Sequence, residues 1–177
     1  MKSIGYLVTV YNEIKTVKQS IKDVIDIDYP NKKILVIDNA STDGSRQIIE
    51  SFRNDNIQMI LRTKNEGFGG TIQEGIKLLN TDYIYIQYSD LEYDHLQSLK
   101  MMNYAIEKNL DVVLGSRLIT KDLKKKSKIK CLIKKPSYLA TIICTFLTNK
   151  FYNLDFTDII GGKLYKTDSV KKIPISS

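Results

Sequence analysis

The sequence has little that would place the protein outside a reducing compartment. Its 177 residues include only two cysteines, Cys131 and Cys144, which cannot form a disulfide framework. No apolar run approaches the roughly 20 residues of a membrane-spanning helix, and the apolar stretch near the N-terminus is too short for a signal peptide. We therefore expect a soluble, cytoplasmic domain. The one histidine, His95, is interpreted as a surface residue at a helix start rather than a catalytic base.

The positive charge of the chain is concentrated in one segment. Lysine and arginine number 27 and aspartate and glutamate 20, which gives a formal net charge of +7. Residues 121–135 hold eight lysines and a single acid, Asp122, and so account for the whole excess. A protein that binds nucleic acid normally has a broader positive surface, so we expect no nucleic-acid partner.

Short β-rich runs alternate with helical stretches over the first 117 residues. The expected strands are Ile4 to Val10, Lys33 to Asp38, Ile57 to Leu61, Asp82 to Gln87, Val112 to Leu114 and, near the end of the chain, Gly161 to Tyr165. The expected helices cover residues 13–28, 43–52, 68–79 and 94–108 and an apolar run from Tyr138 to Leu147. This alternation predicts an α/β protein with a mainly parallel sheet covered on both faces.

Polar residues follow the carboxyl end of each expected strand. In open parallel sheets ligands bind beyond these ends, so the polar residues there are the first candidates for function. They are Tyr11-Asn12-Glu13, Asp38-Asn39, Asn65-Glu66-Gly67, Tyr88-Ser89-Asp90 and Gly115-Ser116-Arg117.

Four longer segments stand out by their order and spacing. They are Val10-Tyr-Asn-Glu13, Ile37-Asp-Asn-Ala-Ser-Thr-Asp-Gly-Ser45, Asn65-Glu-Gly-Phe-Gly-Gly70 and Gln87-Tyr-Ser-Asp-Leu-Glu-Tyr-Asp94, and Gly115-Ser-Arg117 and Thr157-Asp158 extend the set. Together they resemble family 2 glycosyltransferases of the GT-A fold, in particular polyprenyl- and dolichyl-phosphate mannose and glucose synthases. The resemblance implies a single Rossmann-like GT-A domain over residues 1–177, with a nucleotide-sugar-binding half at 1–117. Residues 118–177 would form an acceptor side that is incomplete, because the family usually continues past the last strand.

The resemblance implies that the strand ends bind a GDP- or UDP-sugar. Asp38 can accept hydrogen bonds from the base or the ribose, and Tyr11 can stack on the base, a contact worth roughly 1–3 kcal/mol in nucleic-acid sites. Glu13 can accept a ribose hydroxyl. Glu13 and Asp43 also fit as acidic residues that complement a helix dipole, which is the interpretation we favour for Asp43. The implied donor-binding residues are Thr9, Tyr11, Glu13, Asp38, Asn39, Gly67, Ser89 and Asp90.

The glycine-rich segment from Asn65 to Gly70 is compared with a dinucleotide-binding fingerprint. Its spacing, Gly67-x-Gly69-Gly70, does not match G-x-G-x-x-G, and the segment follows the third strand rather than the first. These differences disfavour a Rossmann dehydrogenase. In the family this loop lets the backbone approach the donor, and the alternative is a plain flexible turn.

Asp90 is the candidate metal ligand. A divalent cation, Mg²⁺ or Mn²⁺, can stabilise the charge on a departing nucleoside diphosphate. The family normally supplies Asp-x-Asp here, whereas this chain reads Tyr88-Ser89-Asp90. Asp90 matches the second aspartate, which is the one expected to touch the metal, and Glu92 and Asp94 follow closely.

Two further residues are candidates for the catalytic side, together with Asp90. Arg117 can pair with a phosphate of donor or acceptor, and otherwise forms a surface ion pair. Asp158 resembles a family position near the reacting sugar, and otherwise is a turn aspartate. A polyprenyl-phosphate acceptor would need no general base, whereas a sugar hydroxyl, as in the synthesis of cell-envelope polysaccharide, would need a carboxylate to take its proton.

The lysine-rich segment suggests a membrane partner. Lys124 to Lys135 precede the apolar run, and anionic bilayers attract such clusters by roughly 1 kcal/mol per basic residue. The enzyme would then sit peripherally on the inner face of the membrane. The alternative is a solvated loop before a core helix. Two functions follow from the whole sequence: an inverting, metal-dependent glycosyltransferase, or a nucleotide-sugar-binding remnant without catalysis.

Overall fold

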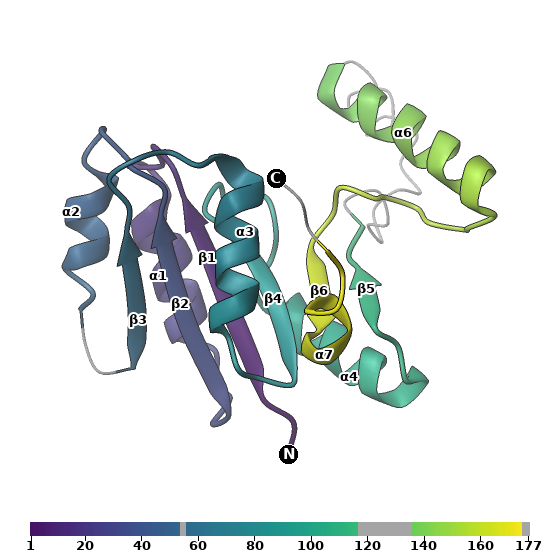
Figure 1. Cartoon of the computed structure of the whole chain (residues 1–177), viewed down its shortest axis with the longest axis horizontal. Helices are drawn as coiled ribbons and strands as arrows, with labels where there is room; N and C mark the ends of the chain where they lie inside the picture. The colour runs from purple at the N-terminus through teal and green to yellow at the C-terminus, as the bar shows by residue number, and fades with distance from the viewer. Residues whose placement is uncertain (54–55, 117–135, 175–177) are drawn as a thin grey trace. The chain divides into compact units, whose positions relative to one another are not determined.

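A computed structural model describes residues 1–53, 56–116 and 136–174 (Figure 1). The strands are β1 (Ile4–Val10), β2 (Lys32–Asp38), β3 (Ile57–Leu61), β4 (Tyr83–Tyr88), β5 (Val112–Leu114) and β6 (Lys163–Lys166). The helices are α1 (Val17–Ile25), α2 (Ser45–Glu50), α3 (Gly67–Leu78), α4 (Gln97–Lys108), α6 (Pro136–Tyr152) and α7 (Thr167–Val170). The chain forms two compact units, one of Met1–Val113 with Lys163–Ser177 and one of Leu114–Gly162.

The sheet has six strands in the order β3-β2-β1-β4-β6-β5. β1 runs parallel to both β2 and β4, and β2 runs parallel to β3. β6 is antiparallel to β4. The predicted α/β class with a mainly parallel sheet is therefore confirmed. Because these three pairings are parallel, the carboxyl ends of β1, β2, β3 and β4 lie along one edge of the sheet.

The sequence of β1 explains why the sheet is covered on both faces. All seven residues of β1 are buried, and their side chains point to alternate faces. Tyr6 and Val8 pack in one core with residues of α1 and α4, whereas Leu7 packs in a second core with Ile76 of α3 and Val170 of α7. Continuous apolar strands of this kind are typical of parallel sheets between two helical layers.

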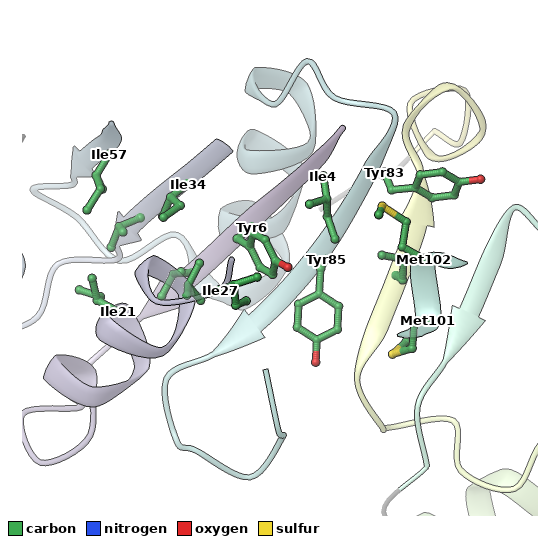
Figure 2. Close-up of a cluster of buried hydrophobic side chains, with 14 of the residues drawn as sticks. Ile4, Tyr6, Ile21, Ile27, Ile34, Ile57, Tyr83, Tyr85, Met101 and Met102 are labelled. Carbon is green, nitrogen blue, oxygen red and sulfur yellow. The ribbon is translucent and has the colours of Figure 1, made fainter. Parts of the chain in front are cut away.

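An aromatic pair lies in the core on the α1 and α4 side. Tyr6 of β1 and Tyr85 of β4 meet edge to face, with ring centroids 6.0 Å apart, and Met101 and Met102 of α4 lie beyond them (Figure 2). The Tyr6 hydroxyl is 2.8 Å from the Ser98 hydroxyl, so its polar atom has a partner inside the core. These contacts fix β1 against β4, the two strands between which a site can form.

The predicted strands are found within one or two residues, but several helices differ from prediction. α1 begins at Val17 rather than residue 13, and α2 covers only Ser45–Glu50 within the predicted 43–52. Gly44, with φ of 100°, precedes α2. The polar residues before α1 and before α2 instead form hydrogen bonds between the two loops. α6 is longer than predicted, at 17 residues. Among the described residues, no helix combines the length and apolar character needed to cross a membrane.

Candidate functional site

A cavity of about 250 Å³ lies at the carboxyl edge of the sheet. Its walls come from the ends of β1 and β4 and from the loops after β1, β2, β3 and β4. The lining residues are Thr9, Val10, Tyr11, Glu13, Asn39, Asn65, Gly67, Phe68, Thr71, Tyr88, Ser89 and Asp90. Every predicted donor-binding residue except Asp38 is on this wall.

A larger cavity, of about 720 Å³, lies near the amino ends of β2 and β3. Residues that line it include Lys32, Ile34, Ile57 and Leu79. Ligands of open parallel sheets bind beyond the carboxyl ends of the strands. The smaller cavity is therefore the better candidate site, although it has the smaller volume.

Hydrogen bonds hold the loop after β1 against the loop after β2. Asn12 has a positive φ of 56°, which exposes its backbone N–H to the Ser41 hydroxyl at 2.9 Å. The Asn12 side-chain oxygen in return accepts the backbone N–H of Thr42 at 2.8 Å. Tyr11, which precedes Asn12, is 49% exposed and lines the cavity, so its ring is available for stacking.

Asp43 strengthens the same junction. Its carboxylate accepts the backbone N–H of Ile14 at 2.9 Å and both the backbone N–H and the hydroxyl of Ser45. The Ser45 hydroxyl also accepts the backbone N–H of Glu13 at 2.9 Å. Hydrogen bonds from the Ser45 hydroxyl and then from backbone N–H groups hold the pKa of Asp43 below its ordinary value. We assigned Asp43 to the helix dipole, but its contacts position the loop that carries Tyr11 and Glu13.

Asp38, the last residue of β2, is fully buried and is not part of the cavity lining. Its carboxylate is 2.6 Å from the guanidinium Nη2 of Arg46 and accepts the backbone N–H of Ser41 at 3.1 Å. The buried carboxylate thus has a cation from within the protein as its partner. A direct contact between Asp38 and a nucleotide stays a prediction.

Asn39 and Arg62 organise the loop between β3 and α3. The Asn39 amide donates to the Asn65 side-chain oxygen at 2.7 Å, and its own oxygen accepts from Arg62 Nη1 and the Glu66 backbone N–H, each at 3.1 Å. Arg62 is 9% exposed and also pairs with Glu74 at 2.5 Å. Sequence reasoning missed Arg62, because a lone arginine after a strand matches no motif.

Gly67 begins α3 at the cavity wall. Its φ is 75°, a backbone conformation that favours glycine, while a side chain added there would meet no atom within 4 Å. Its backbone N–H donates to the Asn65 side chain at 2.7 Å. The side of the backbone where a Cβ would stand is therefore open at Gly67, which is the arrangement expected if a ligand approaches there.

Asp90 is the exposed carboxylate at the end of β4. One of its oxygens accepts the backbone N–H of Glu92 at 2.9 Å, and the preceding Ser89 is buried with its hydroxyl donating to the Thr9 carbonyl oxygen at 2.8 Å. Within the described ranges, no three His, Cys, Asp or Glu side chains gather closely enough to hold a metal ion. Asp90 can thus supply a single carboxylate ligand, and a bound metal would need further oxygen ligands from elsewhere.

Tyr88 takes the place of the first carboxylate of the expected Asp-x-Asp. Its ring stacks on Phe68, with centroids 5.6 Å apart at 18°, and lies 5.3 Å from the ring of Tyr93. The Lys163 ammonium donates to the Tyr88 hydroxyl at 3.1 Å. Sequence reasoning noted the missing aspartate but gave no sign of this aromatic and cationic environment, which depends on a strand 75 residues further along the chain.

The remaining predicted residues lie in or beside the unit Leu114–Gly162. Asp158 is buried, and one of its oxygens accepts the backbone N–H of Ile160 at 2.9 Å. Arg117 and the Lys124–Lys135 cluster lie outside the described residues. Outside this unit, His95 precedes α4 with its Nδ1 3.4 Å from a carboxylate oxygen of Asp23.

A mostly parallel sheet with a loop-lined cavity at its carboxyl edge places the chain among the open α/β proteins, which bind ligands at that edge. A sequence model described as glycosyl transferase family 2 matches residues 6–173, and the chain belongs to this family. Similar proteins include poly-beta-1,6-N-acetyl-D-glucosamine synthases from Staphylococcus epidermidis, 30% identical over 53% of this chain, and Staphylococcus aureus, 25% identical over 81%. The alignments cover 23% and 34% of those relatives, so the chain spans only a part of their length.

Solved structures of glycosyltransferases show the same GT-A fold. Glucosyl-3-phosphoglycerate synthase from Mycobacterium tuberculosis in complex with UDP has a TM-score of 0.66 at 13% identity, covering 98% of this chain and 60% of that one. S. aureus TarS 1-349 in complex with UDP-GlcNAc has a TM-score of 0.57 at 24% identity, over 70% and 38%. The mannosyltransferase PcManGT from Pyrobaculum calidifontis in complex with GDP-Man and Mn²⁺ has a TM-score of 0.56 at 18% identity, over 65% and 35%.

Proposed function

We propose that the cavity at the carboxyl edge binds the nucleotide part of a UDP-sugar, and that the protein transfers the sugar to an acceptor with inversion. The observation that carries this proposal is the convergence of Tyr11, Asn39 and Asp90, from the loops after β1, β2 and β4, with Gly67 at the start of α3 on one cavity. UDP-N-acetylglucosamine is the favoured donor, because the curated relatives are N-acetylglucosamine polymer synthases and the TarS complex holds UDP-GlcNAc. GDP-mannose, held by PcManGT, is the alternative.

Each cavity group has a defined task in this proposal. The exposed ring of Tyr11 stacks on the base, and the Glu13 carboxylate accepts a ribose hydroxyl. The open side of the backbone at Gly67 allows the donor to approach α3 closely. The buried Asp38–Arg46 pair supports the neighbouring loop from below, and its contact with Ser41 links it to the loop that holds Asn12.

Asp90 would hold a divalent metal ion, Mg²⁺ or Mn²⁺. The exposed carboxylate on the cavity wall is a hard oxygen donor of the kind these ions prefer. Diphosphate oxygens of the donor would supply further ligands, because among the described residues no three His, Cys, Asp or Glu side chains gather around one point. When bound, the metal would offset the charge that develops on the departing diphosphate.

The acceptor in this proposal is a sugar hydroxyl on a cell-surface polysaccharide. The relatives are named poly-beta-1,6-N-acetyl-D-glucosamine synthases, and in a polymer of that linkage each sugar is joined to a hydroxyl of the next. Asp158 is then the candidate near the reacting sugar, and Arg117 the candidate for a phosphate contact. A polyprenyl-phosphate acceptor is the alternative. The protein would work at the cytoplasmic face of a membrane, where the basic residues 124–135 meet anionic lipid.

Calorimetric titration with UDP and GDP, each with and without Mn²⁺, tests the donor site. We expect UDP to bind, Mn²⁺ to raise its affinity, and Asp90→Asn to remove that rise. Glu92→Gln is the matched control, since Glu92 is a neighbouring exposed carboxylate that does not line the cavity. If neither nucleotide binds, or if Asp90→Asn keeps the full Mn²⁺ effect, the corresponding part of the proposal is wrong.

A second function, donor binding without transfer, is favoured by one observation. Tyr88 replaces the first aspartate of the family motif and is packed between Phe68 and Tyr93. Release of the sugar from UDP-N-acetylglucosamine, followed by chromatography, separates the two functions. Hydrolysis or transfer supports the enzyme, whereas tight binding with an intact donor supports the binding protein.

A further inference from the structure

β6 brings a lysine to the carboxyl edge of the sheet. In the antiparallel pairing of β6 with β4, Lys163 lies opposite Ile86. Side chains opposite each other share a face of the sheet, and Tyr88 is two residues beyond Ile86, so Tyr88 is on that face as well. The Lys163 ammonium accordingly lies 3.1 Å from the Tyr88 hydroxyl and 5.6 Å from the centre of its ring.

The Tyr88 ring is fixed by its neighbours. Phe68 stacks on it at an interplanar angle of 18°, and Tyr93 packs against it at 42°. Tyr88 and Phe68 both line the cavity. A ring held in this way keeps its hydroxyl in one place, and the hydroxyl in turn orients the Lys163 ammonium beside the cavity wall.

The charges around the cavity give this lysine a role. Glu13 and Asp90, two carboxylates, line the cavity, and the diphosphate of a nucleotide sugar is also an anion. Lys163 adds a cation beside Tyr88, the residue that stands where the family motif has its first carboxylate. An ammonium in this place attracts the diphosphate anion, as a metal ion held by two carboxylates would.

We propose that Lys163, oriented by Tyr88, binds the diphosphate of the donor and thereby replaces part of the divalent metal requirement. This inference rests on the proposed function, because it concerns the same cavity. In this interpretation, the presence of Tyr88 in place of an aspartate removes a negative charge and positions a positive one, and both changes favour binding of the diphosphate anion.

Titration with UDP and with uridine, both in EDTA and in Mn²⁺, tests the inference. Hydrogen bonds to charged groups stabilise by roughly 1.5–3 kcal/mol, so Lys163→Met should lower UDP affinity in EDTA at least about tenfold. Uridine has no diphosphate, and its affinity should change less than about twofold, which also shows that the variant is folded. Lys163→Arg should retain UDP binding in EDTA. Tyr88→Asp should raise the Mn²⁺ enhancement of UDP affinity above that of the wild-type protein.

Lys166→Met is the matched control. Lys166 is on the same strand, but its ammonium is 3.5 Å from Asp111 and it lies opposite Tyr83 at the far end of β4. UDP affinity should be unchanged in this variant. An equal loss of UDP and uridine affinity in Lys163→Met, or wild-type UDP binding that disappears in EDTA, would overturn the role of Lys163 and leave the donor site standing. A wild-type protein that binds neither UDP nor GDP would overturn the donor site and this inference together.

Discussion

The unit that holds the cavity and the unit Leu114–Gly162 differ in how far their side chains are buried or paired within the unit. In the first, β1 is buried along its whole length, and polar groups at the strand ends are paired with one another. In the second, α6 buries Thr141 and Thr145 while its large apolar residues are exposed, among them Ile143, Phe146, Phe151 and Tyr152. A helix with apolar residues on all sides is usually covered. The comparison indicates that the unit with the cavity is self-sufficient, and for the exposed apolar side chains of α6 we predict a partner.

The largest expected effect comes from breaking the buried ion pair of the self-sufficient unit. Asp38→Ala leaves Arg46 without its carboxylate and removes the acceptor for the Ser41 backbone N–H. Removing one partner of a buried pair costs about 3–5 kcal/mol. The Arg46 side chain left behind is 28% exposed, so we expect a cost of about 3–4 kcal/mol, which urea unfolding would measure. Because part of that cost is the unpaired charge on Arg46, the double variant Asp38→Ala with Arg46→Met should be less destabilised than Asp38→Ala alone. Equal stability of the two variants would contradict this account.

A matched pair of truncations sharpens the comparison between the units. Leu7→Ala removes a fully buried side chain from the centre of β1 and should lower the free energy of unfolding by about 2–4 kcal/mol. Phe146→Ala removes a side chain that is 63% exposed and should change it by less than about 0.5 kcal/mol. Thermal unfolding of both variants measures the difference. A large loss of stability in Phe146→Ala would show that α6 is packed within this chain.

The strands could be predicted from the sequence, whereas the contacts that make the site could not. β1 and β3 have the predicted bounds because short apolar runs between polar turns fix them. The loops after β1 and β2 have polar residues that equally suit helix caps, so the sequence could not show that Ser41 and Asp43 instead bind the loop after β1. The environment of Tyr88 depends on the register of β6, and register is a tertiary property.

The apolar surface of α6 predicts binding to lipid. Burial of an aromatic side chain contributes about 1.5–3 kcal/mol, so Phe146→Ser and Phe151→Ser should each weaken binding to phosphatidylglycerol vesicles by roughly tenfold or more. Tyr104→Ser is the control, since Tyr104 is an exposed aromatic residue of α4. Sedimentation with vesicles measures the binding. Added salt should weaken it if the lysines at 124–135 contribute, and unaltered binding of both phenylalanine variants would refute a lipid-facing α6.

A smaller effect than that of the core substitutions concerns a surface anchor of the self-sufficient unit. Hydrogen bonding to Lys2 and then to the Ser3 backbone lowers the pKa of Asp82 to about 2. Because the folded pKa is lowered, the stabilisation is present above the ordinary pKa of an aspartate and is lost as the pH falls through about 2. The side chain is 36% exposed, so Asp82→Asn should cost only about 1 kcal/mol at neutral pH. The free energies of unfolding of the wild-type protein and Asp82→Asn should converge at low pH. A difference that persists there would contradict the stabilising role given to the Asp82 carboxylate.

The antiparallel placement of β6 has a consequence for synthesis of the chain. β4 is complete at Tyr88, but the strand that covers its outer edge ends at Lys166, roughly eighty residues later. At ~5–20 residues per second, a ribosome needs on the order of 4 to 16 s to make that stretch. During this interval the backbone N–H and C=O groups along one side of β4 have no strand beside them, and such an edge pairs readily with another chain. The risk of aggregation in the cell is therefore set by how quickly residues 89–166 emerge.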